Sequence, residues 1–245
     1  MTGEVRLAGE GGVARVTLSH PGKLNAMSRA MWVTLREVFL ALAREPQWRC
    51  VVIEGEGEAF CAGGDISEYP GFRFDEPQLR RFHEEEVWGG LSAILACDVP
   101  VVAAIRGACM GAGVEIASCC DLRLASEEAR FGAPIARLGF PMAEREARLV
   151  ARAAGDLTAR EMLLAAAVLD AREMKARGFL NEVLPAGELA PRIDALARRI
   201  AGLAPQAARM NKQLLRGEPG TYAYADSAEH REGITAFLEK RTPGF

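Results

Sequence analysis

Residues 98–121 read DVPVVAAIRGACMGAGVEIASCCD and carry most of the information about the fold of this chain. They begin as a short apolar, β-branched run behind Pro100, which is the pattern of a buried strand. Glycines then interrupt the run between residues 107 and 113, and residues 114–117 have the composition of a helix start. A strand, a glycine-rich turn and a helix start leave backbone N–H groups without internal partners. Because such N–H groups favour negative charge, the stretch is predicted to hold a ligand site.

A single carboxylate, Glu115, lies within this helix start. Its sequence neighbours are apolar or small, so no exposed helix face is available to it. A glutamate on an average helix is exposed, but burial of this one would raise its pKa toward neutrality, where a proton-transferring group works best. We therefore predict that Glu115 is an acid/base residue. Arg106 or Arg137 could instead pair with it, which would favour a structural role.

Composition narrows the class of protein. A chain of 245 residues, 49% of them hydrophobic, forms one large domain or one domain with a small appendage. The net charge of −3 shows no basic excess, so no nucleic-acid partner is expected. The six cysteines contain no CxxC pair or zinc-like spacing, which indicates no metal site and favours a reducing compartment. Residues 1–18 do not resemble a leader and no apolar run reaches membrane-spanning length, so we predict a cytoplasmic protein without a membrane partner.

Hydrophobic periodicity predicts an α/β core followed by helices alone. The predicted strands are a hairpin over residues 5–18 and runs at 49–54, 100–105, 122–125 and 178–185, with a short strand or turn at 131–135. The predicted helices cover residues 28–42, 75–97, 114–117, 148–154, 159–167, 171–177, 189–201, 205–215 and 227–240. A second glycine-rich loop, residues 55–65, follows the strand at 49–54.

In seven segments, in order and with matching spacing, the chain resembles the crotonase, or enoyl-CoA hydratase/isomerase, superfamily. These segments are residues 21–26, 59–65, 100–121, 131–134, 137–139, 176–181 and 233–241. The resemblance implies an α/β fold, a spiral of repeated ββα turns, over residues 1–190. It also implies a helical region, residues 191–245, that supports a homotrimer or a hexamer of paired trimers.

The resemblance further implies acyl-CoA substrates, with coenzyme A as part of the substrate and no separate cofactor or metal. Members of the family hold the thioester carbonyl between two backbone N–H groups, which by position are those of Gly64 and Ala112. Such donors are commonly worth about 10²–10³ in rate each. The small side chains at both positions agree with the close approach of a ligand.

The coenzyme A moiety is expected, by the same resemblance, to run past two short segments and the last helix. The residues expected to contact it are Lys23, Leu24, Ala26, Ala62, Asp65, Ile66, Phe237 and Lys240. In relatives the positions of Phe237 and Lys240 cover the nucleotide, often from a neighbouring subunit. The alternative is that Phe237 serves packing and Lys240 is a solvated surface charge.

The chain departs from the family's hydratases at one informative position. Those enzymes use two glutamates, of which Glu115 matches the first, while the position of the second holds Ile135. Loss of a positioned acid or base commonly costs about 10²–10⁴ in rate. We predict that Glu144 substitutes, with Glu146 a weaker candidate. The alternative is that Glu144 caps the helix start and pairs with Arg148.

Two further side chains, His83 and Tyr69, lie in a segment that covers the acyl group in relatives. A Ser-His-Asp site is disfavoured, because Ser118 has no histidine at a suggestive distance. The prediction is therefore an enoyl-CoA hydratase-like enzyme that stabilises a thioester enolate. The alternatives are double-bond isomerisation with one carboxylate, decarboxylation, thioester hydrolysis, and a catalytically silent acyl-CoA-binding homologue. Residues 66–79 shape the acyl end of the pocket without specifying chain length.

Overall fold

Two sheets form the framework of the protein, whose computed structural model describes residues 2–245. The larger sheet has the strand order β1 (Glu4–Glu10), β2 (Val13–Ser19), β3 (Cys50–Gly55), β4 (Val101–Ile105), β6 (Leu122–Ser126), β9 (Glu182–Leu184). It is parallel apart from the opening β1–β2 hairpin. The smaller sheet has the order β5 (Ala108–Met110), β7 (Arg130–Gly132), β8 (Val168–Asp170). The predicted α/β class is thus confirmed.

The ββα repeat is visible in how the chain passes between the sheets. Strand β4 of the larger sheet leads to β5 of the smaller sheet and then to helix α4 (Ala112–Ser118). The next turn repeats this order with β6, β7 and, after the short helix η3 (Ile135–Leu138), helix α5 (Glu144–Ala154). Cys61 forms a parallel bridge with Cys109, which places the glycine-rich loop after β3 beside the loop after β5. The predicted spiral therefore brings both glycine-rich loops together.

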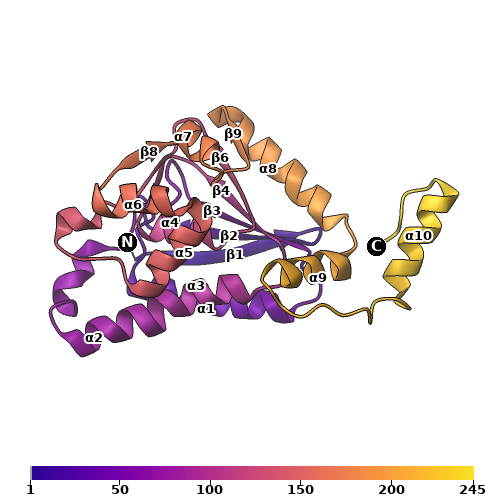
Figure 1. Ribbon diagram of the computed structural model, residues 1–245, viewed down its shortest axis with the longest axis horizontal. Coiled ribbons are helices and arrows are strands. Elements are labelled where there is room, and N and C mark those ends of the chain that lie inside the picture. Colours follow the sequence, from indigo (N-terminus) through magenta and orange to yellow (C-terminus); the bar gives the residue numbers. More distant parts are fainter. Residues whose placement is uncertain (1) are drawn as a thin grey trace.

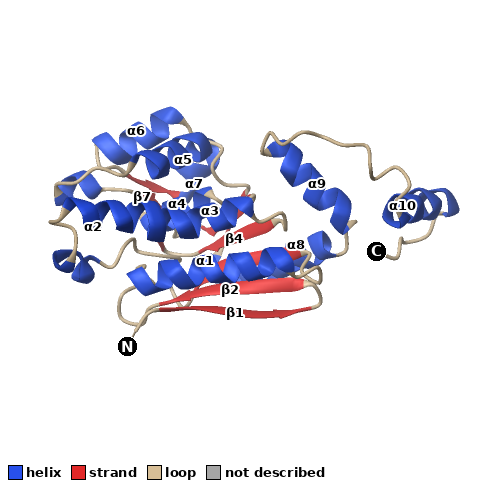
Figure 2. Ribbon diagram, turned by 90° about the horizontal axis from the view of Figure 1, so that it is seen from below, coloured by secondary structure: helices blue, strands red, loops and turns tan. Residues whose placement is uncertain are grey.

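Helices cover both faces of the larger sheet (Figures 1 and 2). On β3, Val51 and Ile53 join the core that includes α1 (Arg29–Arg44) and α3 (Trp88–Ala96). Cys50 and Val52 point to the opposite core, under helix α8 (Ala186–Ala201). Strands buried on both faces explain why the sequence shows continuous apolar runs rather than alternation. Ser28 accepts a hydrogen bond from Met31 N at 3.2 Å and begins α1, as predicted.

The helix predicted over residues 75–97 contains a change of helical type. It consists of α2 (Glu76–Arg81), the π-helical segment η2 (Phe82–Val87) and α3, and the 3₁₀ helix η1 (Ile66–Gly71) precedes it. A π-helical turn holds more residues than an α-helical one, so it changes the direction of the side chains around it. This segment forms one wall of the cavity described below.

The C-terminal helices extend the molecule on one side. Helices α6 (Asp156–Leu164) and α7 (Ala171–Ala176) stay on the body, whereas α9 (Pro205–Leu215) leads to α10 (Ala228–Glu239), which stands apart (Figures 1 and 2). Glu229 at the start of α10 accepts hydrogen bonds from the N–H groups of Gln206 and Ala207, each at 2.9 Å. The predicted division at residues 190/191 falls inside α8, which packs on the sheet.

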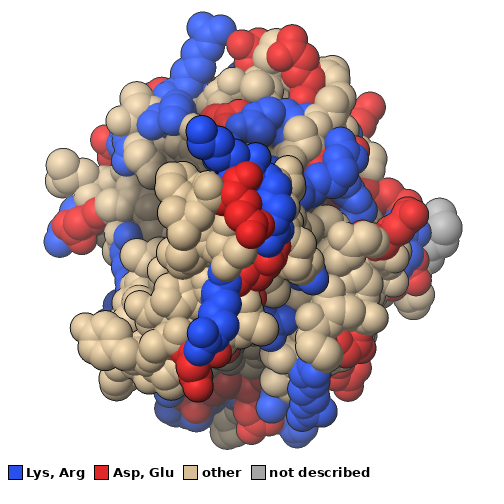
Figure 3. Space-filling view, turned by 90° about the vertical axis from the view of Figure 1, so that its right-hand side faces the viewer, with Lys and Arg blue, Asp and Glu red and all other residues tan. Residues whose placement is uncertain are grey.

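Figure 3 views this side of the molecule, where positive and negative side chains are interspersed among uncharged ones. No helix within residues 2–245 combines the length and the apolar character needed to cross a membrane.

Candidate active site

A cavity of about 230 Å³ opens where the two glycine-rich loops meet the helical segment of residues 66–87. Gly64 from the first loop, and Ala112 and Glu115 from α4, contribute to its wall. Ile135 closes another part of the wall, at the position where hydratases of the resembled family carry their second glutamate. The structure thus places the two predicted carbonyl-binding residues, Gly64 and Ala112, and the predicted acid/base residue Glu115 around one cavity.

Two backbone N–H groups on this cavity have no acceptor within residues 2–245. On either side of Gly64, Met27 N donates to Gly63 O and Asp65 N donates to Met27 O, each at 2.8 Å, which leaves the Gly64 N–H unused. Ala112 is the first residue of α4, so its N–H precedes the helical hydrogen bonds. The preceding Gly111 has φ +48°, a conformation that favours glycine. The sharp turn there exposes the start of α4 to the cavity.

Glu115 is buried without a partner for its carboxyl group. Its exposed fraction is 9%, and no group among residues 2–245 hydrogen-bonds to its side chain. Arg106 and Arg137, the two candidate partners, donate instead to Gly57 O and Ala166 O, at 3.3 and 3.2 Å. Burial, and secondarily the charge of Glu146, raises the pKa of Glu115 to about 8. A group of this kind exchanges protons near neutral pH.

The structure does not bring Glu144 to the cavity, and we withdraw it as the second acid. Its side chain is 74% exposed and pairs with Arg148 at 2.6 Å, four residues along α5. The ion-pair part of the alternative therefore describes its position, whereas its side chain forms no capping hydrogen bond at the start of α5. Glu146 lies two residues further along the helix, on a different side, and only 2% of its surface is exposed. Glu146, the weaker of the two candidates from the sequence, is thus the carboxylate whose charge raises the pKa of Glu115.

Glu146 pairs with His83, which lies on the π-helical segment and lines the cavity. The distance from His83 Nδ1 to Glu146 Oε1 is 3.2 Å. The sequence singled out both residues separately, but they are 63 positions apart in the chain, so no local pattern could join them. A histidine oriented by a buried carboxylate is a proton-transfer arrangement. Two ionisable elements at the cavity are thus candidates for proton transfer, Glu115 and the His83–Glu146 pair.

The segments predicted to contact coenzyme A meet at the mouth of the cavity. Lys23 Nζ donates to Asp65 Oδ2 at 2.6 Å and to Ser67 Oγ at 2.7 Å. Ala62 N donates to Leu24 O at 3.0 Å, which lays residues 23–26 along residues 62–66. Ala62 and Ile66 line the cavity itself. These contacts bring the predicted residues together, namely Lys23, Leu24, Ala26, Ala62, Asp65 and Ile66.

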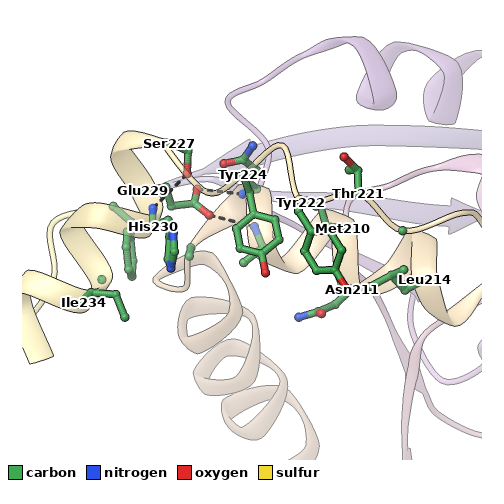
Figure 4. A pocket seen from close by; sticks show the side chains of 16 residues that line it. Met210, Asn211, Leu214, Thr221, Tyr222, Tyr224, Ser227, Glu229, His230 and Ile234 are labelled. Carbon is green, nitrogen blue, oxygen red and sulfur yellow. Dashed lines mark hydrogen bonds between the residues drawn. The ribbon is translucent and has the colours of Figure 1, made fainter.

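Phe237 and Lys240, by contrast, lie away from this cavity in the single chain. Both are on or directly after α10, and Phe237 is 82% exposed. Helix α10 and α9 enclose a separate hollow of about 580 Å³ (Figure 4). Two of its polar side chains serve as helix caps, because Glu229 accepts hydrogen bonds from the start of α9 and Ser227 accepts one from His230 N.

The spiral fold, with its cavity between two glycine-rich loops, is that of the crotonase class of acyl-CoA-processing enzymes. The chain belongs to the enoyl-CoA hydratase/isomerase family, whose model matches residues 8–219. It is 32% identical to the 2,3-dehydroadipyl-CoA hydratase of Escherichia coli, over 95% of this chain and 94% of that protein. It is 31% identical to the human mitochondrial enoyl-CoA hydratase domain-containing protein 3, over 95% of this chain and 80% of that protein.

A solved structure of an enoyl-CoA hydratase/carnithine racemase from Magnetospirillum magneticum is similar with a TM-score of 0.94 and 34% identity. The similarity covers 98% of this chain and 94% of that one. The protein is accordingly a hydratase-like enzyme of the acyl-CoA-processing class, as the resemblance implied.

Proposed function

We propose that the protein adds water to the double bond of a 2-enoyl-CoA thioester. The observation that carries this proposal is the unpaired, buried carboxyl group of Glu115 on the same cavity as the free N–H groups of Gly64 and Ala112. In the proposed reaction, the thioester carbonyl oxygen lies between these donors. Negative charge develops on that oxygen as the nucleophile attacks, and preorganised donors stabilise it most at that moment.

Proton transfer in this reaction needs both ionisable elements of the cavity. Glu115 in its carboxylate form takes a proton from water while the water oxygen bonds to Cβ, and the electron pair of the double bond moves to form the enolate. A proton added to Cα then completes the hydrated thioester. We assign this second transfer to His83, which Glu146 orients and which replaces the glutamate absent at Ile135. Addition of water across the double bond involves no net oxidation or reduction, so the proposed reaction needs no redox cofactor.

Double-bond isomerisation is the alternative, and the apolar side chain of Ile135 favours it. In that reaction Glu115 alone removes a proton from one carbon of the enoyl chain, which forms a dienolate, and returns the proton to another carbon of that dienolate. Decarboxylation and thioester hydrolysis would use the same carbonyl site and rank below isomerisation among the alternatives. A silent acyl-CoA-binding homologue is disfavoured because an uncompensated buried carboxyl group is costly to retain.

We also propose that the catalytic unit is an oligomer, a trimer or hexamer, in a reducing cytoplasm. The exposed apolar side chains of α10, among them Phe237 and Leu238, support packing against a second copy. In that arrangement Phe237 and Lys240 would approach the coenzyme A of a neighbouring site. The six buried, free cysteines agree with a reducing compartment.

The test follows the loss of enoyl-thioester absorbance with purified wild type and with Glu115→Gln, His83→Asn and the control Glu144→Gln. Hydration predicts that Glu115→Gln and His83→Asn each lose about 10²–10⁴ in kcat/KM while Glu144→Gln stays near wild type. Because the base form of Glu115 is required, kcat/KM should rise with pH toward about 8. Turnover of 3-enoyl-CoA but not 2-enoyl-CoA, insensitive to His83→Asn, would establish isomerisation instead. Thioester binding without any turnover would establish the silent homologue.

A further inference from the structure

A positively charged side chain, Arg73, forms part of the wall of the Glu115 cavity. Its guanidinium carbon lies 3.9 Å from the ring centre of Phe140 and 4.5 Å from that of Tyr69. Both rings also line the cavity. Aromatic faces attract a cation but leave the N–H groups of a guanidinium without hydrogen-bond acceptors. Arg73 is therefore held in place by rings that do not neutralise it.

No carboxylate within residues 2–245 forms an ion pair with Arg73. The nearby Arg29 also packs on a ring, that of Phe72, but its Nε donates to Glu86 at 2.8 Å. Burial lowers the pKa of Arg73; the hydroxyl group of Tyr69 opposes that effect, but no carboxylate does. A half-buried charge without a counterion costs free energy unless a ligand supplies the counterion.

Tyr69 lies between Arg73 and the reacting end of the site. A Cβ atom placed on Gly64 would lie 2.1 Å from the hydroxyl oxygen of Tyr69, so this hydroxyl group reaches the residue whose N–H faces the thioester carbonyl in our proposal. The ring of the same tyrosine contacts Arg73. The side chain of Tyr69 thus spans the separation between the unpaired guanidinium of Arg73 and the expected position of the thioester carbonyl.

We propose that Arg73 binds a carboxylate carried by the acyl group itself, so that the substrates are CoA thioesters of short dicarboxylic acids. This inference rests on the proposed acyl-CoA site and adds the chemical class of the acyl group. A guanidinium matches a carboxylate in geometry, with two parallel N–H···O bonds, and such charge-assisted bonds are stronger than neutral ones. The remaining cavity wall offers apolar contacts to the chain between the two ends, from Ile135, Leu138 and Met142.

The test compares the binding of two saturated six-carbon thioesters, hexanoyl-CoA and hexanedioyl-CoA, by isothermal titration calorimetry. They differ in the terminal carboxylate alone, and their binding requires no turnover. The variants are Arg73→Met, which keeps an apolar stem of similar length, and the control Arg145→Met, whose arginine lies over the ring of Trp88 outside this cavity. Circular dichroism confirms that each variant is folded, and Arg73→Lys retains the charge without the planar fork.

We expect wild type and Arg145→Met to bind hexanedioyl-CoA about tenfold or more tightly than hexanoyl-CoA. Arg73→Met should abolish this preference while its dissociation constant for hexanoyl-CoA stays within about twofold of wild type, and Arg73→Lys should retain part of the preference. Equal affinities in wild type would overturn the inference, and so would an equal loss for both ligands in Arg73→Met, which would assign Arg73 to the CoA phosphates. Failure of both thioesters to bind wild type would overturn the acyl-CoA site as well.

Discussion

Replacing Glu115 by Gln should stabilise the folded protein at alkaline pH, because the buried carboxyl group disfavours its own ionisation. Its pKa in the folded chain is about 8, against an ordinary value of 4.5. Between these values the folded state keeps a proton that the unfolded state has lost, so stability falls as pH rises. The full difference between the two pKa values corresponds to a loss of about 5 kcal/mol in the free energy of unfolding, and about 2 kcal/mol of this is lost between pH 6.5 and pH 9. Glutamine, which does not ionise, removes this pH-dependent loss.

The assay is urea-induced unfolding of wild type, Glu115→Gln and Glu144→Gln at pH 6.5 and pH 9, at one protein concentration. The free energy of unfolding of Glu115→Gln, relative to wild type, should increase by about 2 kcal/mol between these two pH values. Glu144→Gln is the matched control, because its exposed carboxylate takes part only in a surface ion pair. Parallel pH dependence in wild type and Glu115→Gln would refute the reasoning, since it would mean that Glu115 ionises in the fold as it does in water.

Two further predictions concern the close contact at Gly64 and the buried ion pair of Lys212. Gly64→Ala should lose about 10² or more in kcat/KM, because its methyl group would lie 2.1 Å from the hydroxyl oxygen of Tyr69 and displace the Gly64 N–H. Adding Tyr69→Phe, which removes that oxygen, should restore part of the activity, and an equally inactive double variant would argue against a steric cause. Lys212→Met should lower the free energy of unfolding by about 1–3 kcal/mol. The reason is that the buried Lys212 Nζ donates to Val99 O at 3.0 Å and pairs with Asp121 Oδ2 at 2.7 Å. Urea unfolding measures this loss, and a variant as stable as wild type would show that the pair contributes nothing.

The local elements followed from local residues. The apolar runs of β3 and β4, the cap at Ser28 and the glycine-rich turn before α4 each depend on neighbours within a few positions, which is where propensity and turn chemistry act. The burial of Glu115 was also predictable, because apolar neighbours on both sides leave a helical carboxylate no exposed face. The family followed from motifs spread over nearly the whole chain, and the matching family model confirms it.

The choice of partner for each ionisable group, by contrast, was made by tertiary structure. Glu144 and Glu146 have similar sequence surroundings, and only the packing of α5 decides that one faces solvent while the other is buried. His83 reaches Glu146 because a π-helical segment, which no residue pattern indicated, lies against α5.

Arg73 did not attract attention in the sequence, since an arginine on a polar segment is ordinarily solvated. That no carboxylate within residues 2–245 forms an ion pair with it is a property of the folded cavity. The sequence alone thus determined most of the elements, the family and the buried acid, because these depend on short-range patterns and on matched motifs. The three-dimensional fold alone decided which charges meet and which stay unpaired, because that depends on distances between segments far apart in the chain.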